Sequence, residues 1–400
     1  MPVVCMISSL HGLYDDRIYW KEALSLKKAG YEVVHISTGE ADTDTVSEHG
    51  IRLMQVKRKR YFRQPYLDIL FRRLTFRTGP YKKIFALCAA IRADAYHFHD
   101  IQINKIGRQL TKLPNAPRVI YDAHEDYADL LISQHPNRGL MRLFIRIYAV
   151  WLNHWERSCA ANYDCIIAAV DHIYNKFDFM AVLGKAIILH NYTALQPPAI
   201  KPYDDKKYDA IYCGQINAVR GAMQILEAVN LLKSTLPHIR VLLLGPVPGY
   251  RFKIQLEQFI SEHHLEKNID LHDPVAYRDV EAYYQDSRIG LGIFMPVSIF
   301  YYGLQIKTFE YMAFGLPVVC SNFGTIRDIV TSSRCGVTVD PQSPDEISKA
   351  LMELLTNRDL YSTLSTNGME VVKSTFNWKL EEAKLLRLYD HLLKQDSRGG

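Results

Sequence analysis

Histidine, carboxylate and arginine side chains gather in short segments that each follow a run of apolar residues. The first segment, SSLHGLYDDRIYW, carries His11, Gly12, Asp15 and Arg17. Such side chains serve acid–base chemistry and bind anions, and a glycine lets the backbone approach a phosphate closely. A helix beginning here would add the affinity of its N-terminus for anions. The alternative is that Asp15 or Asp16 only caps this helix.

The second segment, YHFHD, ends an apolar run with His97, His99 and Asp100. Alternation along a strand puts the two histidines on one face of the sheet. A metal site would need a third ligand, so we expect no metal here.

The third segment, VIYDAHEDYADL, brings His124, Glu125 and Asp126 to the end of another apolar run. Titratable residues massed at a strand end suit a cleft that binds sugar hydroxyls or a developing oxyanion. The alternative is that Glu125 and Asp126 only open the next helix, where its dipole favours acids.

The fourth segment, FYYGLQIKTFEYMAFGLPVV, is the most specific. It sets Glu310 in a short helix between Gly303 and Gly315, and a strand follows from Pro317. A carboxylate beside a glycine-rich loop is suited to binding ligand hydroxyls.

These segments need a scaffold that brings strand ends together. Short runs rich in Val and Ile alternate with stretches of helical period such as 16–29, which predicts α/β structure with doubly wound, mostly parallel sheets. Ligands of such sheets bind outside the carboxyl ends of the strands. The expected strands are 3–7, 33–36, 95–98, 119–121, 165–168 and 186–189, then 208–212, 241–244, 289–293, 318–321 and 336–339.

The chain has 400 residues, 48% of them apolar and 23% charged, which fits a globular protein of two domains and excludes disorder. The strand series lapses in the Pro-rich stretch TALQPPAIKPYDDKK. We therefore predict a Rossmann-like N-terminal domain at 1–195, a linker at 196–207, a Rossmann-like C-terminal domain at 208–377 and a closing helix at 378–400.

Six motifs in order resemble those of the GT-B glycosyltransferases, in particular glycosyltransferase family 4. They are HGLYDDRI, YHFHD, YDAHED, CGQINAVRG, FNWKLEEAK and the segment around Glu310, which resembles the pattern E-G-F-G-x-x-x-x-E-A-M-A-x-G-x-P-V-V. The resemblance covers nearly the whole chain. It implies two Rossmann-like domains facing a central cleft, with the C-terminal helix crossing back to the N-terminal domain. In this family the N-terminal domain, here 1–195, binds the acceptor, and the C-terminal domain, here 208–377, binds the nucleotide sugar.

The resemblance also implies roles for individual residues. Glu310 matches the glutamate that binds the ribose hydroxyls of the donor, and Arg220 matches the cation on the diphosphate. Gly303 matches a glycine near the donor phosphate, and His124 the histidine beside the transferred sugar. Lys307 would supply further positive charge, unless it is only an exposed lysine at a helix start.

Two positions depart from the family pattern. Tyr302 stands where the family has a glutamate on the donor sugar, and Gln215 stands where its phosphate loop has a basic residue. We expect both to bear on donor choice or activity. Gly12 and Tyr302 complete the expected donor side, and the acceptor-side candidates are His11, Asp15, Arg17, His99, Asp100 and Glu125.

The implied activity is retaining transfer of a sugar from a nucleotide diphosphate donor to a lipid-linked glycan acceptor in polysaccharide assembly. It needs no cofactor and no metal, because cations and helix N-terminal amides would stabilise the leaving diphosphate. The alternatives are a nucleotide-sugar epimerase, a phosphorylase-like enzyme, or a catalytically impaired relative that acts as a binding partner.

A basic segment at 57–83 departs from the rest of the chain. Its ten basic residues and one Asp give +9, which leaves −4 for the remainder of a chain of net charge +5. Interspersed aromatic residues make an anionic membrane surface the expected partner, and Arg138, Arg142 and Arg146 would extend that face. No nucleic-acid motif accompanies it, so we expect no nucleic-acid partner. The alternative is a solvated helical face.

Seven scattered cysteines without zinc-ligand spacing indicate buried thiols in a reducing compartment. The N-terminus has no positively charged region before its apolar run, and no apolar stretch is long enough to span a bilayer. We expect a cytoplasmic protein, peripheral at the inner face of the cell membrane.

Overall fold

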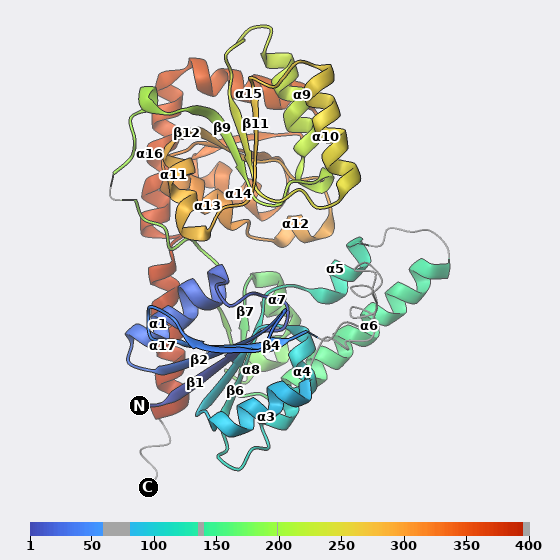
Figure 1. Cartoon of the computed structure of the whole chain (residues 1–400), viewed down its shortest axis with the longest axis vertical. Coiled ribbons are helices and arrows are strands. Elements are labelled where there is room, and N and C mark those ends of the chain that lie inside the picture. Colours follow the sequence, from blue (N-terminus) through green and yellow to red (C-terminus); the bar gives the residue numbers. More distant parts are fainter. Residues whose placement is uncertain (59–80, 135–139, 198, 395–400) are drawn as a thin grey trace. The chain divides into compact units, whose positions relative to one another are not determined.

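The computed structural model describes residues 1–58, 81–134, 140–197 and 199–394, and forms two compact units (Figure 1). Unit 1 comprises Met1–Asn191 together with the residues from Lys379 on, and unit 2 comprises Tyr192–Trp378. Each unit is a parallel sheet with helices packed on it, as the alternating pattern predicted.

The sheet of unit 1 has, among the described residues, eight strands in the order β3-β4-β2-β1-β5-β6-β7-β8. All neighbours pair in parallel except β3, which runs antiparallel to β4 at one edge. The strands are β1 Val3–Ile7, β2 Glu32–Gly39, β3 Thr43–Val46, β4 Arg52–Lys57, β5 Ala95–Phe98, β6 Arg118–Ala123, β7 Cys165–Ala168 and β8 Ala186–Ile188.

The helices of unit 1 follow the strands along the chain. They are the π-helix η1 Asp16–Ala23, α1 Leu24–Lys28, α3 Tyr81–Ile91, the 3₁₀ turn η2 Ile101–Ile103, α4 Asn104–Leu110, α5 Tyr127–Gln134, α6 Leu140–Ala160, α7 Asp171–Lys176, α8 Asp178–Val182 and α17 Trp378–Lys394.

The predicted helix at 16–29 begins with π geometry, which the sequence pattern did not indicate. A π-helix joins residues five apart, and two ion pairs use this spacing. Lys21 Nζ lies 2.8 Å from Asp16 Oδ2, and Arg17 Nε lies 2.9 Å from Glu22 Oε1. The wider helix thus allows two cations to meet carboxylates of their own turn.

The sheet of unit 2 is parallel in the order β11-β10-β9-β12-β13-β14. Its strands are β9 Tyr208–Cys213, β10 Val241–Leu244, β11 Ile269–His272, β12 Ser287–Gly292, β13 Val318–Ser321 and β14 Gly336–Val339. Its helices are α9 Ala222–Leu232, α10 Tyr250–Glu262, α11 Val280–Gln285, α12 Ser298–Tyr302, α13 Ile306–Ala313, α14 Gly324–Ser333, α15 Pro344–Thr356 and α16 Arg358–Ser374, with 3₁₀ turns η3 Tyr203–Asp205, η4 Ala218–Arg220 and η5 Tyr277–Asp279.

Most predicted strands form within a residue or two of the expected bounds. Sequence reasoning missed β3, β4 and β11. The four residues of β3 are all exposed, and only Ile269 of the four residues IDLH of β11 is buried, so neither strand carries a strong apolar run.

The boundary between the units lies after residue 191, whereas the sequence predicted the first domain to end at 195. Tyr192 packs against Phe309 and Phe376, so this residue already belongs to the core of unit 2. The predicted linker at 196–207 is likewise held by unit 2. Its Lys206 is buried and donates to the Ser287 carbonyl oxygen at 2.8 Å, and burial lowers the pKa of Lys206 to about 8.

Helix α17 returns the chain to unit 1, as predicted. Its Tyr389 is fully buried and its hydroxyl lies 2.9 Å from His97 Nδ1. The main-chain oxygen of Leu392 accepts from Arg118 Nε at 3.1 Å. The helix therefore reaches the polar interior of the N-terminal sheet.

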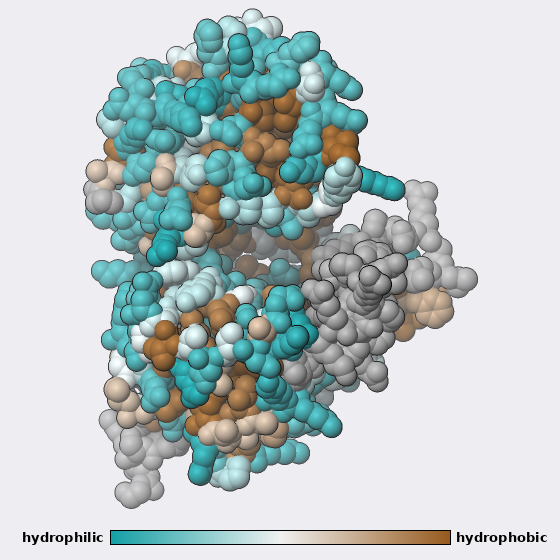
Figure 2. All heavy atoms as spheres, viewed as in Figure 1, coloured by the Kyte–Doolittle hydropathy of each residue, from teal (hydrophilic) through white to brown (hydrophobic). Residues whose placement is uncertain are grey.

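All seven cysteines are free and buried, as expected. None of the helices in the described part of the chain combines the length and apolar composition of a membrane span. Of the basic segment 57–83, residues 59–80 lie outside the described residues. On the face shown in Figure 2, hydrophilic residues cover most of the visible surface and hydrophobic ones gather beside α10.

Candidate functional site

The strand order of unit 1 brings three of the sequence motifs together. Strands β1, β5 and β6 are neighbours and run parallel, so the loops that follow them meet at one edge of the sheet. His11 follows β1, His99 and Asp100 follow β5, and His124 follows β6.

Asp100 organises the loop after β1. Its Oδ2 accepts from the backbone N–H groups of Ser9 and Leu10, and its Oδ1 lies 3.1 Å from His11 Nδ1. Burial alone would lower the pKa of His11, but the hydrogen bond and charge of Asp100 raise it to about 9. Burial acts to raise the pKa of Asp100, and His11 with the two backbone donors lowers it to about 2. A partly exposed imidazolium therefore sits at this strand end at neutral pH.

His124 extends this group through a second histidine. Its Nε2 lies 3.2 Å from His99 Nδ1 and 3.4 Å from Asp122 Oδ1, and its ring centroid is 5.3 Å from that of His11. The His124 side chain is 11% exposed, whereas His99 is buried. His124 and His11 are thus the members of this histidine group that a ligand can reach.

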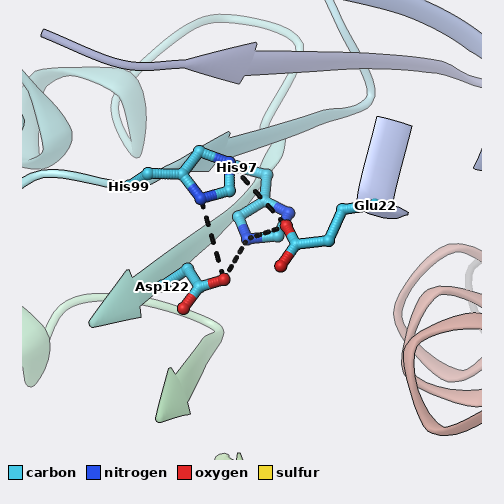
Figure 3. Close-up of side chains that lie close together, drawn as sticks. All are labelled: Glu22, His97, His99 and Asp122. Carbon is cyan, nitrogen blue, oxygen red and sulfur yellow. Dashed lines mark ion pairs between the residues drawn. The ribbon is translucent and has the colours of Figure 1, made fainter. Parts of the chain in front are cut away.

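A buried cluster of Arg17, Glu22, His97, His99 and Asp122 lies beneath them, and Figure 3 shows four of its side chains converging. Arg17 donates to both oxygens of Asp122, with Nη2 at 2.8 Å from Oδ2. His97 Nε2 lies 3.7 Å from Asp122 Oδ2 and 3.8 Å from Glu22 Oε2. The two histidine rings stack with centroids 4.5 Å apart.

The pKa values of the two carboxyl groups of the cluster are shifted in opposite directions. Burial and the charge of Asp122 raise the pKa of Glu22 well above its usual range, against the opposing charge of Arg17. Burial also acts on Asp122, but Arg17 and His124 keep its pKa well below its usual range. Burial lowers the pKa of both His97 and His99. Asp122 is therefore the principal counter-ion of Arg17, whereas burial disfavours the charged forms of Glu22, His97 and His99.

The cluster offers ligand atoms of Glu22, His97, His99 and Asp122 within 4.8 Å of one another, which is a spacing that a metal ion could use. Glu22 and Asp122 are the further ligands that the sequence analysis did not identify. The guanidinium of Arg17, however, already contacts both carboxylates. Because Arg17 supplies the positive charge, we interpret the cluster as structural.

The remaining N-terminal candidates either cap a helix or are exposed to solvent. Asp15 caps η1 by accepting from the backbone N–H groups of Arg17 and Ile18, as the alternative held. Asp126 accepts from Ala128 N–H at the start of α5, whereas Glu125 and Gly12 are exposed.

In unit 2, the loop after β9 leads into the N-terminus of α9. Gly221 caps this helix with φ of +64°, and a Cβ there would lie 2.6 Å from the Ile293 carbonyl oxygen. Only glycine fits this turn. Asn217 caps the preceding turn by accepting from Arg220 N–H. The chain thereby holds Arg220 beside a helix N-terminus, which is an arrangement that attracts phosphate.

Helix α13 carries the second part of this site. Glu310 is buried, its Oε2 accepts from the Tyr284 hydroxyl at 2.6 Å, and it lies 3.0 Å from Lys307 Nζ. Its Oε1 has no hydrogen-bond partner within the described part of the chain. Gly303 ends α12, and a Cβ there would lie 2.7 Å from the Ile299 carbonyl oxygen. Tyr302 is half exposed at the end of α12.

Electrostatics link Arg220 with Lys307 and Glu310. Burial raises the pKa of Tyr212, while the positive charges of Arg220 and Lys307 both act to lower it. The same lysine and Glu310 act in opposite directions on Cys213, whose pKa burial raises. Two cations and one carboxylate thus surround the carboxyl end of β9, which suits a diphosphate joined to a hydroxyl-bearing group.

A cavity of about 760 Å³ opens where β10 and β11 end. It is lined by the loop from Gly245 to Val247, by one face of α10, and by His272 and Asp273. Its size falls within the range of small-molecule sites.

Sequence reasoning found the residues at strand ends but missed Glu22, Asp122 and Tyr284. Glu22 lies within a helix and Tyr284 in α11, so neither follows a strand. The five-residue spacing of Arg17 and Glu22 would have been a signal only if the π geometry had been known.

Residues 197–371 match the family model described as Glycosyl transferases group 1. D-inositol 3-phosphate glycosyltransferase of Paenarthrobacter aurescens is 23% identical over 188 residues, which are 46% of this chain and 43% of that enzyme. GDP-mannose-dependent alpha-(1-6)-phosphatidylinositol monomannoside mannosyltransferase of Mycobacterium tuberculosis is 35% identical over 83 residues, which are 21% of this chain and 22% of that enzyme. The matches thus span less than half the length of both relatives.

Two solved structures resemble the whole chain. Sucrose-phosphate synthase from Thermosynechococcus elongatus has a TM-score of 0.72 at 17% identity and covers 99% of this chain and 100% of its own. HepE from Anabaena, in complex with UDP and glucose, has a TM-score of 0.71 at 11% identity, with coverage of 98% and 100%. These likenesses show the two-domain GT-B fold, and with the family match they support a glycosyltransferase.

The opposite pKa shifts of Asp122 and Glu22 can be tested by removing the charge of each side chain in turn. Asp122→Asn should lower the free energy of unfolding by about 3–5 kcal/mol, because it leaves the buried Arg17 charge without its counter-ion. Glu22→Gln should cost less than about 1.5 kcal/mol, because burial disfavours the charged form of Glu22 and an amide can take the place of the neutral acid. Urea denaturation of the full chain measures both. Equal losses of unfolding free energy in the two variants would contradict the opposite pKa shifts of Asp122 and Glu22.

The stability difference between Glu22→Gln and the wild type should depend on pH, and the raised pKa of Glu22 fixes the sign of this dependence. A raised folded-state pKa means that Glu22 stabilises the fold below its ordinary value of 4.5, and this contribution is lost as the pH rises towards the folded-state pKa. Glu22→Gln should therefore gain stability relative to the wild type as the pH rises above 4.5. A difference that is constant with pH would show that folding does not shift the pKa of Glu22.

Proposed function

We propose that this protein transfers a sugar from a nucleotide diphosphate sugar to a lipid-linked glycan acceptor in polysaccharide assembly, with retention at the anomeric carbon, as in glycosyltransferase family 4. The observation that carries the proposal is Glu310. It is a buried carboxylate whose Oε1 has no hydrogen-bond partner among the described residues, and it stands beside Lys307. The charges of Lys307 and Arg220 both act on Tyr212.

In this proposal, Glu310 accepts hydrogen bonds from the ribose hydroxyls through Oε1. Lys307 and Tyr284 hold Oε2 and thereby orient the carboxylate. Arg220 and the amides at the start of α9 bind the diphosphate, with Gly303 giving the backbone room nearby. UDP-sugars are the first donors to test, because the HepE structure holds UDP and glucose.

The chemical step is charge stabilisation. The bond from the anomeric carbon to the diphosphate oxygen breaks, and a bond to the acceptor oxygen forms on the same face of the sugar. The acceptor proton passes to the leaving phosphate oxygen. Arg220 and Lys307 stabilise the negative charge that develops there, so the proposal includes no resident metal or cofactor.

On the acceptor side, we assign binding to the strand-end loops of unit 1. His124 and His11 are partly exposed, and Glu125 is exposed. Arg17, His99 and Asp100 are buried, and we assign them the role of positioning these groups. The proposed site of action is the inner face of the cell membrane, which the charge of segment 57–83 supports.

Glu310→Gln should weaken the binding of a nucleoside diphosphate by about 1.5–3 kcal/mol, because a hydrogen bond to a charged group is lost. Calorimetric titration with UDP and GDP measures it. Glu353→Gln, at an exposed position of α15, is the control and should bind normally. Unchanged affinity in Glu310→Gln would remove this residue from the donor site.

Arg220→Ala should weaken the binding of a nucleoside diphosphate far more than that of the nucleoside, because the guanidinium acts on phosphate charge. The exposed Arg251→Ala serves as the control. If Arg220→Ala weakens both ligands equally, the loop after β9 has a structural role only.

His124→Ala should lower turnover by about 10- to 1,000-fold with donor affinity nearly unchanged, because a group beside the reacting sugar acts on the transition state. Release of nucleoside diphosphate in the presence of acceptor measures turnover, and His238→Ala, exposed in unit 2, is the control. Near-normal turnover would leave His124 as a structural residue.

A further inference from the structure

Helix α6 exposes large apolar side chains over two turns of its first half. Leu143, Phe144, Ile147, Val150 and Trp151 are each between 50% and 71% exposed. In Figure 1 this half of α6 extends beyond the sheet of unit 1. Elsewhere in the described residues, exposed apolar side chains of this size are more scattered along the chain.

These side chains share one face. At 100° per residue they fall within an arc of about 120°. The opposite face of the helix carries the buried Ile145, Ala149 and Leu152. A helix on the surface of a soluble domain normally turns a polar face to water, so an apolar outer face indicates contact with another surface.

The charges around this face have one sign. Arg142 and Arg146 are exposed, at about 80° and 40° from the same edge of the apolar arc. Glu156 is the one acidic residue in the sequence of α6 and is buried. Trp151 stacks with Tyr148 and Trp155 on the same helix. Exposed apolar and aromatic side chains flanked by arginines have the composition of a helix that lies on an anionic membrane.

We propose that the outer face of α6, consisting of Leu143, Phe144, Ile147, Val150 and Trp151 with Arg146 and the more distant Arg142 along one side, docks on the surface of an anionic lipid bilayer. The apolar side chains enter the level of the headgroups, and the two arginines bind lipid phosphates. This inference rests on the proposed function and extends it, because a lipid-linked acceptor would be presented at such a surface.

Vesicle co-sedimentation of the full chain tests the proposal. Vesicles of phosphatidylcholine with about 30% phosphatidylglycerol should bind the protein, and vesicles of phosphatidylcholine alone should bind it at least about tenfold more weakly. Ile147→Asp combined with Val150→Asp should reduce binding at least about tenfold, because two apolar contacts are lost and charge is added. Arg142→Gln with Arg146→Gln should cost about fivefold per arginine.

Controls separate this surface from others. Val182→Asp, at an exposed position of α8, should bind vesicles like the wild type. Brominated lipids should quench tryptophan emission, and Trp151→Phe should lose most of that quenching. Binding that survives the double aspartate variant, but disappears when Lys57, Arg58, Lys59 and Arg60 are changed to Gln, would overturn the role of α6.

A second copy of the chain is the competing occupant. A wild type that sediments as a dimer without binding vesicles, and becomes a monomer in the double aspartate variant, would also overturn the proposal. Nucleoside diphosphate titration in lipid-free solution tests the donor site separately. Failure of vesicle binding with intact nucleotide affinity would therefore reject the membrane surface and leave the proposed activity standing.

Discussion

The burial of Arg17 is the constraint on which unit 1 depends. Taking a guanidinium out of water costs several kcal/mol, and only well-placed carboxylates offset that cost. The chain supplies Asp122 of β6 as the main counter-ion, and Glu22 of the same π-helix also contacts the guanidinium, although burial disfavours its charged form. This one requirement fixes the positions of η1, of β6, and of His97 and His99 relative to one another.

The cluster also connects distant parts of the chain. His97 contacts Tyr389 of α17, and Arg17 donates to the carbonyl oxygen of Leu189. The C-terminal helix is therefore bound to the same polar interior that supports the strand-end loops. A change in the charge of this interior would affect both the C-terminal helix and the strand-end loops, because polar networks in a low dielectric are strongly coupled.

Unit 2 positions its charged groups through glycine turns, and not through a buried ion pair as unit 1 does. Its loops are shaped by glycines at which a Cβ would clash, notably Gly221 and Gly303. These turns bring Arg220 and Lys307 to the end of β9, where the sheet itself contributes no charge. Glu310 then stands among groups that hold one of its oxygens and leave the other without a partner in the described chain. Fixed donors and acceptors of this kind bind a ligand without first reorganising.

The sequence by itself determined the two alternating α/β series, most strand positions, and the strand-end motifs around His11, His99, His124 and Glu310. Apolar runs and glycine turns are local signals, and parallel sheets place strand ends together by rule. Tertiary structure alone decided that Arg17 and Asp100 turn inward, that the pKa values of Glu22 and Asp122 shift in opposite directions, and that Tyr284 orients Glu310. It also decided which face of α6 meets water. The physical reason is that burial, charge pairing and a π turn depend on residues that are far apart in the chain, and no local pattern records them.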